Sequence, residues 1–120
     1  MQTHTYQTLL EVSKRVNWRV DDIIGGDKRL DFSKPFLPET FARTEALSFL
    51  SDRERLTLNH IRAHGYLAMF ALVEGFILPF VNTAIAHDDG TPHRAPALQQ
   101  FASEEEKHME LFRRFLIDFR

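Results

Sequence analysis

One stretch of the sequence, residues 65–81, is apolar or glycine at nearly every position. Only Tyr66, Glu74 and Pro79 depart from this pattern. A helix that is apolar on every side cannot lie on a solvated surface, because other protein or a membrane has to cover it. This stretch therefore restricts the chain to folds in which one helix is buried on several sides.

The residues that flank this stretch predict the ends of a long helix. Ser51 and Glu54 have the spacing of a capping box, in which a serine and a glutamate cap the first helical turn reciprocally. Apolar positions continue past Pro79 to Ile85, so we expect the proline to kink the helix without ending it. The sequence predicts a first long helix over residues 52–86.

A second long helix is predicted after a short loop at residues 88–92. Pro96 suits the first turn of a helix, and a helical apolar pattern then continues to the last residue. This pattern predicts a helix over residues 95–119. A loop this short makes the two helices antiparallel neighbours, so the predicted fold class is all-α with a helical hairpin over residues 51–120.

The first fifty residues are predicted to form an arm that wraps the hairpin (arm 1–50). Loosely helical spacing of apolar residues predicts a short helix over residues 5–18. The glycines at 25 and 26 are expected to prevent the helix from continuing further. Residues 27–38 carry Asp, Lys, Ser and two prolines and are expected to be extended. A further short helix is expected to begin near Pro38 and end near Leu47.

Composition removes several classes of function. The sequence has no cysteine, which excludes disulfides, thiolate metal sites and cysteine nucleophiles. A formal net charge of −2 gives no reason to expect a nucleic-acid partner. The first residues show no secretory signal, so we expect a cytoplasmic protein. Any metal site must use histidine and carboxylate ligands, which suit iron, manganese or zinc.

Glu74 is predicted to lie at the centre of an apolar stripe on the first long helix. At 100° per residue, the members of this stripe fall within about 40° of Glu74. A buried carboxylate costs several kcal/mol unless it is protonated, paired with a cation or bound to a metal. An arginine ion pair and a neutral glutamate are therefore the alternatives to a metal. The stripe consists of Leu56, Ala63, Leu67, Phe70, Leu78, Val81 and Ile85.

The second helix carries Glu105 and His108 on one apolar face. Their Glu-x-x-His spacing places a carboxylate and an imidazole one turn apart, where both can reach one cation. A half-buried Glu–His hydrogen bond is the alternative. The apolar residues of this face are Leu98, Phe101, Ala102, Met109, Phe112, Leu116 and Phe119. The side chains predicted to face solvent are Glu104, Glu106, Lys107, Glu110 and Arg113.

The two faces are predicted to meet at nearly the same height. Glu74 lies about 14 residues before the loop centre near Asp88, and Glu105 about 17 residues after it. At a rise of about 1.5 Å per residue, the two levels differ by roughly one turn or less. Facing carboxylates repel unless a cation lies between them. The sequence therefore predicts a metal site formed by Glu74, Glu105 and His108.

A glutamate on one helix and Glu-x-x-His on the next form half of the ligand pattern of a di-iron carboxylate bundle. The amino-acid sequence also resembles those of the di-iron oxygenases similar to p-aminobenzoate N-oxygenase, over roughly residues 15–120. The segments that resemble their first two bundle helices are residues 58–66, Phe70, Val73, Glu74 and 76–81, and then 101–112. Residues 30–35 and 37–39 resemble that family's leader.

The resemblance implies a ferritin-like bundle with a di-iron centre that activates O₂. By this resemblance Glu74 is a terminal ligand, Glu105 a bridging ligand and His108 a ligand to the same iron. Family members continue into a second helix pair with another Glu, another Glu-x-x-His and an extra His, whereas this sequence stops at Arg120. We therefore expect either a homodimer or a missing C-terminal half-bundle to complete the site.

Three functions remain open at the level of sequence. The first is a di-iron oxygenase or oxidase-type centre acting on a small-molecule substrate, with Phe70, Phe101 and Phe112 as its apolar wall. The second is a truncated or degenerate half-bundle that acts as an interaction or structural protein without catalysis. The third is a membrane span at residues 65–86, against which the mid-span Glu74 argues. We expect no membrane.

Overall fold

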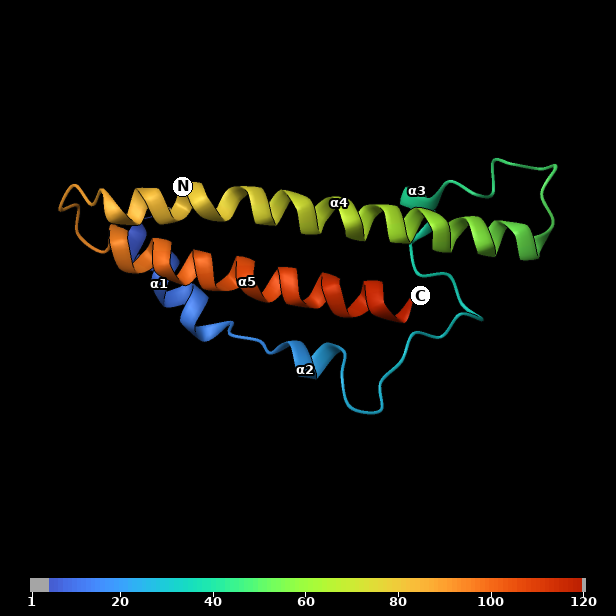
Figure 1. Cartoon of the computed structure of the whole chain (residues 1–120), viewed down its shortest axis with the longest axis horizontal. Coiled ribbons are helices and arrows are strands. Elements are labelled where there is room, and N and C mark those ends of the chain that lie inside the picture. Colours follow the sequence, from blue (N-terminus) through green and yellow to red (C-terminus); the bar gives the residue numbers. More distant parts are fainter. Residues whose placement is uncertain (1–4, 120) are drawn as a thin grey trace.

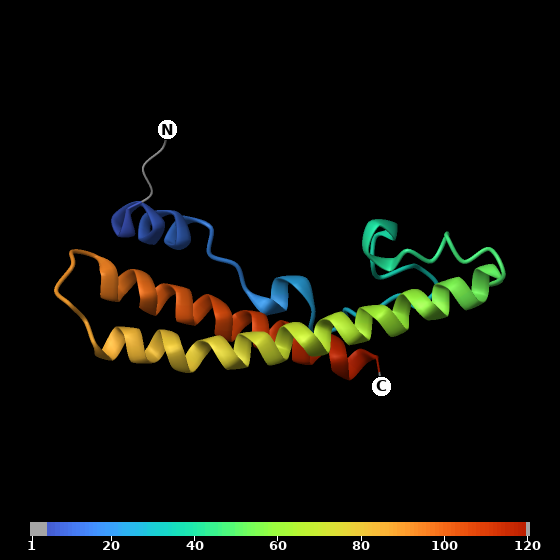
Figure 2. The ribbon, with the colours of Figure 1, turned by 90° about the horizontal axis from the view of Figure 1, so that it is seen from above.

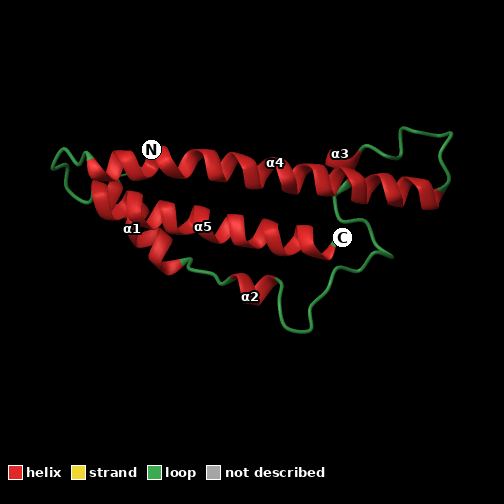
Figure 3. Cartoon of the chain, viewed as in Figure 1, coloured by secondary structure: helices red, strands yellow, loops and turns green. Residues whose placement is uncertain are grey.

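The computed structural model describes residues 5–119, and within that range the chain consists of helices and loops without a strand (Figure 3). The all-α fold class is confirmed. The helices are α1 (Tyr6–Arg15), α2 (Val20–Ile23), α3 (Glu39–Ala42), α4 (Asp52–Ala86) and α5 (Arg94–Asp118) (Figure 1).

Helix α4 begins and ends where the sequence predicts. The Ser51 backbone N–H donates to Glu54 Oε2 at 2.8 Å, and Ser51 Oγ accepts from the Glu54 backbone N–H, which completes the capping box. The helix continues through Pro79 to Ala86. Thr83 Oγ1 donates to the carbonyl oxygen of Pro79 at 2.8 Å in the turn after the proline. Pro79 therefore does not end the helix.

Helices α4 and α5 lie side by side and run in opposite directions (Figures 1 and 2). His93 adopts a left-handed backbone conformation with φ of 64°, which turns the chain into α5. Arg94 then donates to the carbonyl oxygen of Ala84 at 3.0 Å and ties the loop to the end of α4. The predicted pair of long helices over residues 52–86 and 95–119 is present, with α5 starting and ending one residue earlier than predicted.

The amino-terminal part of α4 extends beyond the end of α5 and is covered by the loop that follows α2 (Figure 1). Asn59 is buried and accepts through Oδ1 from the backbone N–H groups of Phe36, at 2.9 Å, and Leu37, at 3.0 Å. Its Nδ2 donates to the carbonyl oxygen of Leu37 at 2.8 Å. One side chain of α4 therefore satisfies three backbone groups of an otherwise irregular segment.

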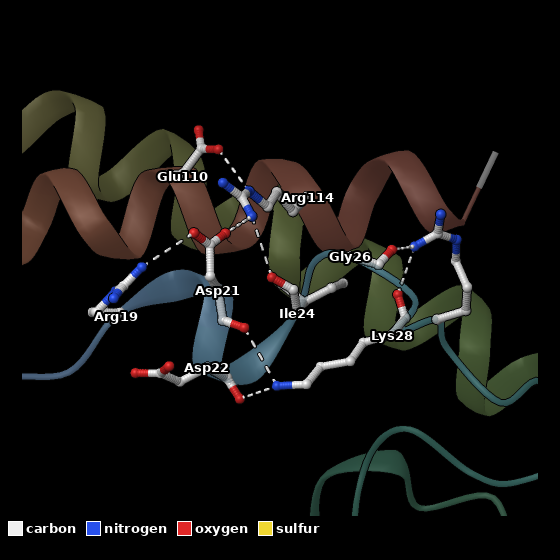
Figure 4. Close-up of polar contacts among 9 residues, drawn as sticks. Arg19, Asp21, Asp22, Ile24, Gly26, Lys28, Glu110 and Arg114 are labelled. Carbon is white, nitrogen blue, oxygen red and sulfur yellow. Dashed lines mark hydrogen bonds and ion pairs between the residues drawn. The ribbon is translucent and has the colours of Figure 1, made fainter.

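The arm carries three short helices, and α1 and α3 lie on the same side of the hairpin (Figure 2). Helices α1 and α2 contact α5, whereas α3 contacts α4. Arg114 of α5 anchors the arm by donating to the carbonyl oxygen of Ile24 at 3.2 Å and to the carboxylate of Asp21 (Figure 4). The same guanidinium contacts Glu110 at 2.8 Å.

Two predicted boundaries in the arm are wrong. Helix α1 ends at Arg15 and not near residue 18, so Trp18 lies in an extended segment. Helix α3 ends at Ala42, well before Leu47, because Arg43 adopts the left-handed conformation with φ of 48°. The Glu39 carboxylate holds this turn by accepting from the Thr44 hydroxyl and the Glu45 backbone N–H, each at 2.8 Å.

Helix α4 also carries exposed apolar side chains on the side away from Glu74, which we name the outer stripe. Its members are Met69, Leu72, Val73, Phe76 and Phe80, which are 44–74 % exposed. Consistent with this, α4 is long and apolar enough to cross a membrane. An 18-residue stretch of α4 has a mean hydropathy of 1.7, and only 6 % of that stretch is buried. The outer stripe therefore requires a cover that this chain does not supply within residues 5–119.

Two glycines are expected to respond in opposite directions to replacement by alanine. Gly25 has φ of 137°, and a Cβ there would lie 2.9 Å from Arg114 Nη1, so Gly25→Ala should lower the free energy of unfolding by about 1–3 kcal/mol. Gly65 lies in α4, and a Cβ added there would meet open space. Gly65→Ala should therefore raise the free energy of unfolding by about 0.5–1 kcal/mol. Denaturant unfolding measures both: a rise in Gly25→Ala would contradict the described backbone at Gly25, and a fall in Gly65→Ala would contradict the open space at Gly65.

Candidate metal centre

The three residues predicted to bind a metal come together between the long helices. Glu74 comes from α4, Glu105 and His108 come from α5, and one ligand atom of each lies within 4.8 Å of the others. His108 Nδ1 is 3.2 Å from Glu105 Oε2 and 3.6 Å from Glu74 Oε1. Ligand atoms bonded to one cation at about 2.1 Å lie about 3 to 5 Å apart, and these two separations fall within that range.

Burial follows the predicted helical phase for the two glutamates, whereas His108 is more exposed than that phase predicts. The Glu105 side chain is 8 % exposed and that of Glu74 is 17 % exposed, whereas His108 is 37 % exposed. Glu106 is exposed, so the phase correctly selects Glu105 from three consecutive glutamates. The centre is therefore closed around its carboxylates and more open at its imidazole.

Electrostatics at the centre favour an added cation. Burial, followed by the neighbouring Glu105 carboxyl, raises the pKa of Glu74 to about 7, and His108 opposes the shift. Glu74 Oε1 lies 3.6 Å from His108 Nδ1 and pairs with no arginine within the described residues. A proton or a metal ion remains as the neutralising charge, and the neutral glutamate stays open as the alternative.

Aromatic rings form a wall along one side of the centre. Phe112 lies 5.8 Å from Phe70 and 6.2 Å from His108, measured between ring centroids. Tyr66 extends the wall, because its ring is stacked on Phe70 at 6.1 Å. Phe70 and Phe101 each remain 43 % exposed. The wall is therefore apolar, as predicted, but open at its outer edge.

Two polar residues of α5 do not face solvent as predicted. The side chains of Glu104 and Lys107 are 19 % and 21 % exposed and form an ion pair at 2.6 Å. They are covered because Lys107 also contacts Asn17 and Trp18 of the arm. Glu106 and Arg113 are exposed as predicted. Glu110 is partly covered because it accepts from Arg114 at 2.8 Å.

Trp18 is a residue of the centre that the sequence did not indicate. Its indole ring stacks on the His108 imidazole, with ring centroids 5.7 Å apart and planes inclined by 21°. The one available signal is that Trp18 is the sole tryptophan and lies beside a predicted helix end. That signal does not connect it with a residue ninety positions away.

The remaining described histidines have packing roles or lie in loops. His60 Nε2 is 2.8 Å from the Lys34 carbonyl oxygen, and His64 packs edge-on against Phe119. His87 and His93 lie at the ends of the loop between the long helices.

The fold and the cluster together define the class of protein: it is all-helical and has a Glu–Glu–His group whose geometry could hold a metal ion. None of the protein-family models, curated proteins or solved structures compared with the chain matches it.

Proposed function

We propose that this chain is a ferritin-like metal-binding protein with an O₂-activating, di-iron oxygenase or oxidase-type centre. The observation that carries the proposal is the meeting of a buried carboxylate, a partly buried carboxylate and an imidazole from two facing helices. Carboxylate and imidazole ligands suit iron, and manganese fits the same set. Glu74, Glu105 and His108 are the proposed ligands.

Each protein group has a distinct part in this proposal. Bound iron would supply the O₂ chemistry. Glu105 and Glu74 hold the negative charge that attracts the cation, and His108 provides a neutral ligand. Phe70 and Phe112 exclude water from the side of the centre where their rings lie.

We further propose that a homodimer completes the centre. One chain offers three ligand side chains, whereas a di-iron bundle uses four glutamates and two histidines. A second copy related by a two-fold axis would supply exactly the missing set and cover the exposed edges of Phe70 and Phe101. A C-terminal half-bundle, located on another polypeptide or on a longer form of this one, would satisfy the same requirement.

A second candidate function is supported by the outer stripe of α4. Because these side chains lie more than about 90° around the helix from Glu74, a dimer built around the metal leaves them partly exposed. A half-bundle that binds another protein through this stripe, without catalysis, is therefore the alternative. A membrane is a less favourable cover, since Glu74 lies midway along α4 and a carboxylate is costly in hydrocarbon. We propose a cytoplasmic location for the protein.

Metal analysis combined with mass in solution tests this proposal. Protein purified without detergent should contain iron or manganese, or bind Fe²⁺ or Mn²⁺ tightly under anaerobic conditions, with two ions per dimer. Light scattering should give twice the mass of 14.0 kDa. Failure to bind either ion would reject the metal function. A metal-loaded monomer would reject only the dimer, and a requirement for detergent would favour the membrane alternative.

A further inference from the structure

The segment between α1 and α2 lies directly over one proposed ligand. Trp18 stacks on the His108 imidazole at 5.7 Å between centroids, and Phe112 lies nearly parallel to the same imidazole, with an interplanar angle of 28°. Two nearly parallel ring neighbours restrict rotation of the imidazole about its side-chain bonds. His108 is therefore oriented by contacts that come from two distant parts of the sequence.

Lys107 fixes this segment in place. Its Nζ donates to Asn17 Oδ1 at 2.8 Å and to the Trp18 carbonyl oxygen at 3.2 Å, and it lies 5.1 Å from the centre of the Trp18 ring. Glu104 Oε1 is a further partner at 2.6 Å. We name Asn17, Trp18 and Lys107 the clasp. The clasp is built from the residue next to His108 in sequence, so the position of Trp18 is tied to the position of the ligand.

A second anchor prevents the segment from pivoting about the clasp. About two helical turns further along α5, Arg114 holds the carbonyl oxygen of Ile24 and the carboxylate of Asp21 (Figure 4). Helix α1 contacts α5 on the other side of the clasp. Trp18 is thus held between two attachments to the same helix, which makes its stacking on His108 a defined contact.

We propose that Trp18 is a positioning residue for the ligand His108, and that the clasp couples docking of the arm to occupancy of the metal centre. This inference rests on the proposed metal function. A metal ligand binds best when its orientation is fixed in advance by neighbouring groups. By thermodynamic linkage, any gain in metal affinity caused by the docked arm is matched by an equal stabilisation of docking when metal binds.

The affinity test compares three forms of the whole chain titrated anaerobically with Mn²⁺. Trp18→Ala should weaken Mn²⁺ binding about tenfold, which is the lower end of the range for groups that orient a metal ligand. Trp18→Phe keeps a stacking ring and should restore most of the affinity. In the wild type, Mn²⁺ should change the fluorescence of Trp18, the sole tryptophan.

A second measurement uses the wild type alone and does not depend on how a variant folds. Arg19 is a trypsin site directly after the clasp, with a side chain that is 75 % exposed. Mn²⁺ should slow cleavage after Arg19 several-fold. Cleavage after the exposed Arg43, which follows α3 and lies away from the clasp, should be unchanged and serves as the internal control.

The outcomes separate this inference from the proposed function. If the wild type binds Mn²⁺ but Trp18→Ala binds it equally well and Arg19 gains no protection, the clasp inference is overturned and the metal function stands. Equal losses in Trp18→Phe and Trp18→Ala would also overturn the stacking role. If the wild type binds neither Mn²⁺ nor Fe²⁺, both proposals are rejected together.

Discussion

Glu105→Gln is expected to weaken Fe²⁺ or Mn²⁺ binding by more than about a hundredfold, whereas Glu106→Gln should leave it unchanged. Loss of groups that merely orient a metal ligand costs about 10–100-fold in affinity, so loss of a charged ligand should cost more. The substitution is nearly isosteric and removes only the charge and one acceptor oxygen from a side chain that is 8 % exposed. Anaerobic calorimetric titration measures both affinities.

The comparison with an adjacent glutamate tests which face of α5 carries the metal ligand. Glu106 is exposed and therefore is the matched control. Glu104 is a poorer control, because its ion pair with Lys107 supports the clasp. If the metal holds the proposed dimer together, Glu105→Gln should also shift the mass in solution towards the monomer. Equal losses of affinity in Glu105→Gln and Glu106→Gln would show that the wrong face was chosen.

Glu74→Gln is expected to abolish tight metal binding and, at the same time, to stabilise the metal-free protein above pH 7. Burial, followed by the neighbouring Glu105 carboxyl, raises the pKa of Glu74 to about 7 from an ordinary value of 4.5. Above pH 7 the folded protein without metal must hold this side chain as a charged carboxylate in a disfavoured position. A neutral glutamine removes that cost, which by this shift is up to about 3 kcal/mol.

The sign of the pH dependence follows from the direction of this shift. Because the pKa is higher in the folded state, protonation of Glu74 stabilises the fold below about pH 4.5. That stabilisation is lost as pH rises through about 7. The free energy of unfolding of the metal-free wild type should therefore fall, relative to Glu74→Gln, between these two values. Asp31 and Glu39, whose pKa values are lowered, act at more acidic pH and cancel in the comparison.

Denaturant unfolding of the metal-free wild type and Glu74→Gln at a series of pH values measures this difference. The exposed Glu106→Gln again provides the matched control, and its difference from the wild type should not follow the same curve. A difference between wild type and Glu74→Gln that stays constant from pH 4 to pH 8 would contradict a raised pKa at Glu74. Retained metal affinity in Glu74→Gln would remove Glu74 from the ligand set.

The parts of the structure that the sequence predicts are those determined by local chemistry and helical phase. The capping box at Ser51 and Glu54 gives the first residue of α4, because both partners of each hydrogen bond lie within one turn. The apolar pattern around Glu105 gives its burial, because Ala102 and Glu105 lie on the same side of α5 and both are buried. The meeting of Glu74 with His108 then follows from a short loop.

The parts that the sequence does not predict depend on contacts between distant residues. Glu104 and Lys107 belong to the polar side of α5, and nothing near them in sequence shows that the arm will cover that side. Trp18 reaches His108 only because Lys107 and Arg114 hold the arm against α5. Likewise, Arg43 ends α3 through a left-handed conformation supported by Glu39, which the apolar pattern does not encode.

The attachment of the arm to α5 has a consequence for the order in which the protein folds. The contacts of Asn17 and Trp18 with Lys107 span about ninety residues, whereas α4 and α5 are joined by a short loop. Closing a short loop is faster and loses less chain entropy than closing a long one, so the hairpin should form first and the arm dock afterwards. During synthesis the arm leaves the ribosome long before its binding surface exists. Until α5 is complete, the apolar surface of α4 is exposed to other chains, and this interval is when aggregation or chaperone binding is most favoured.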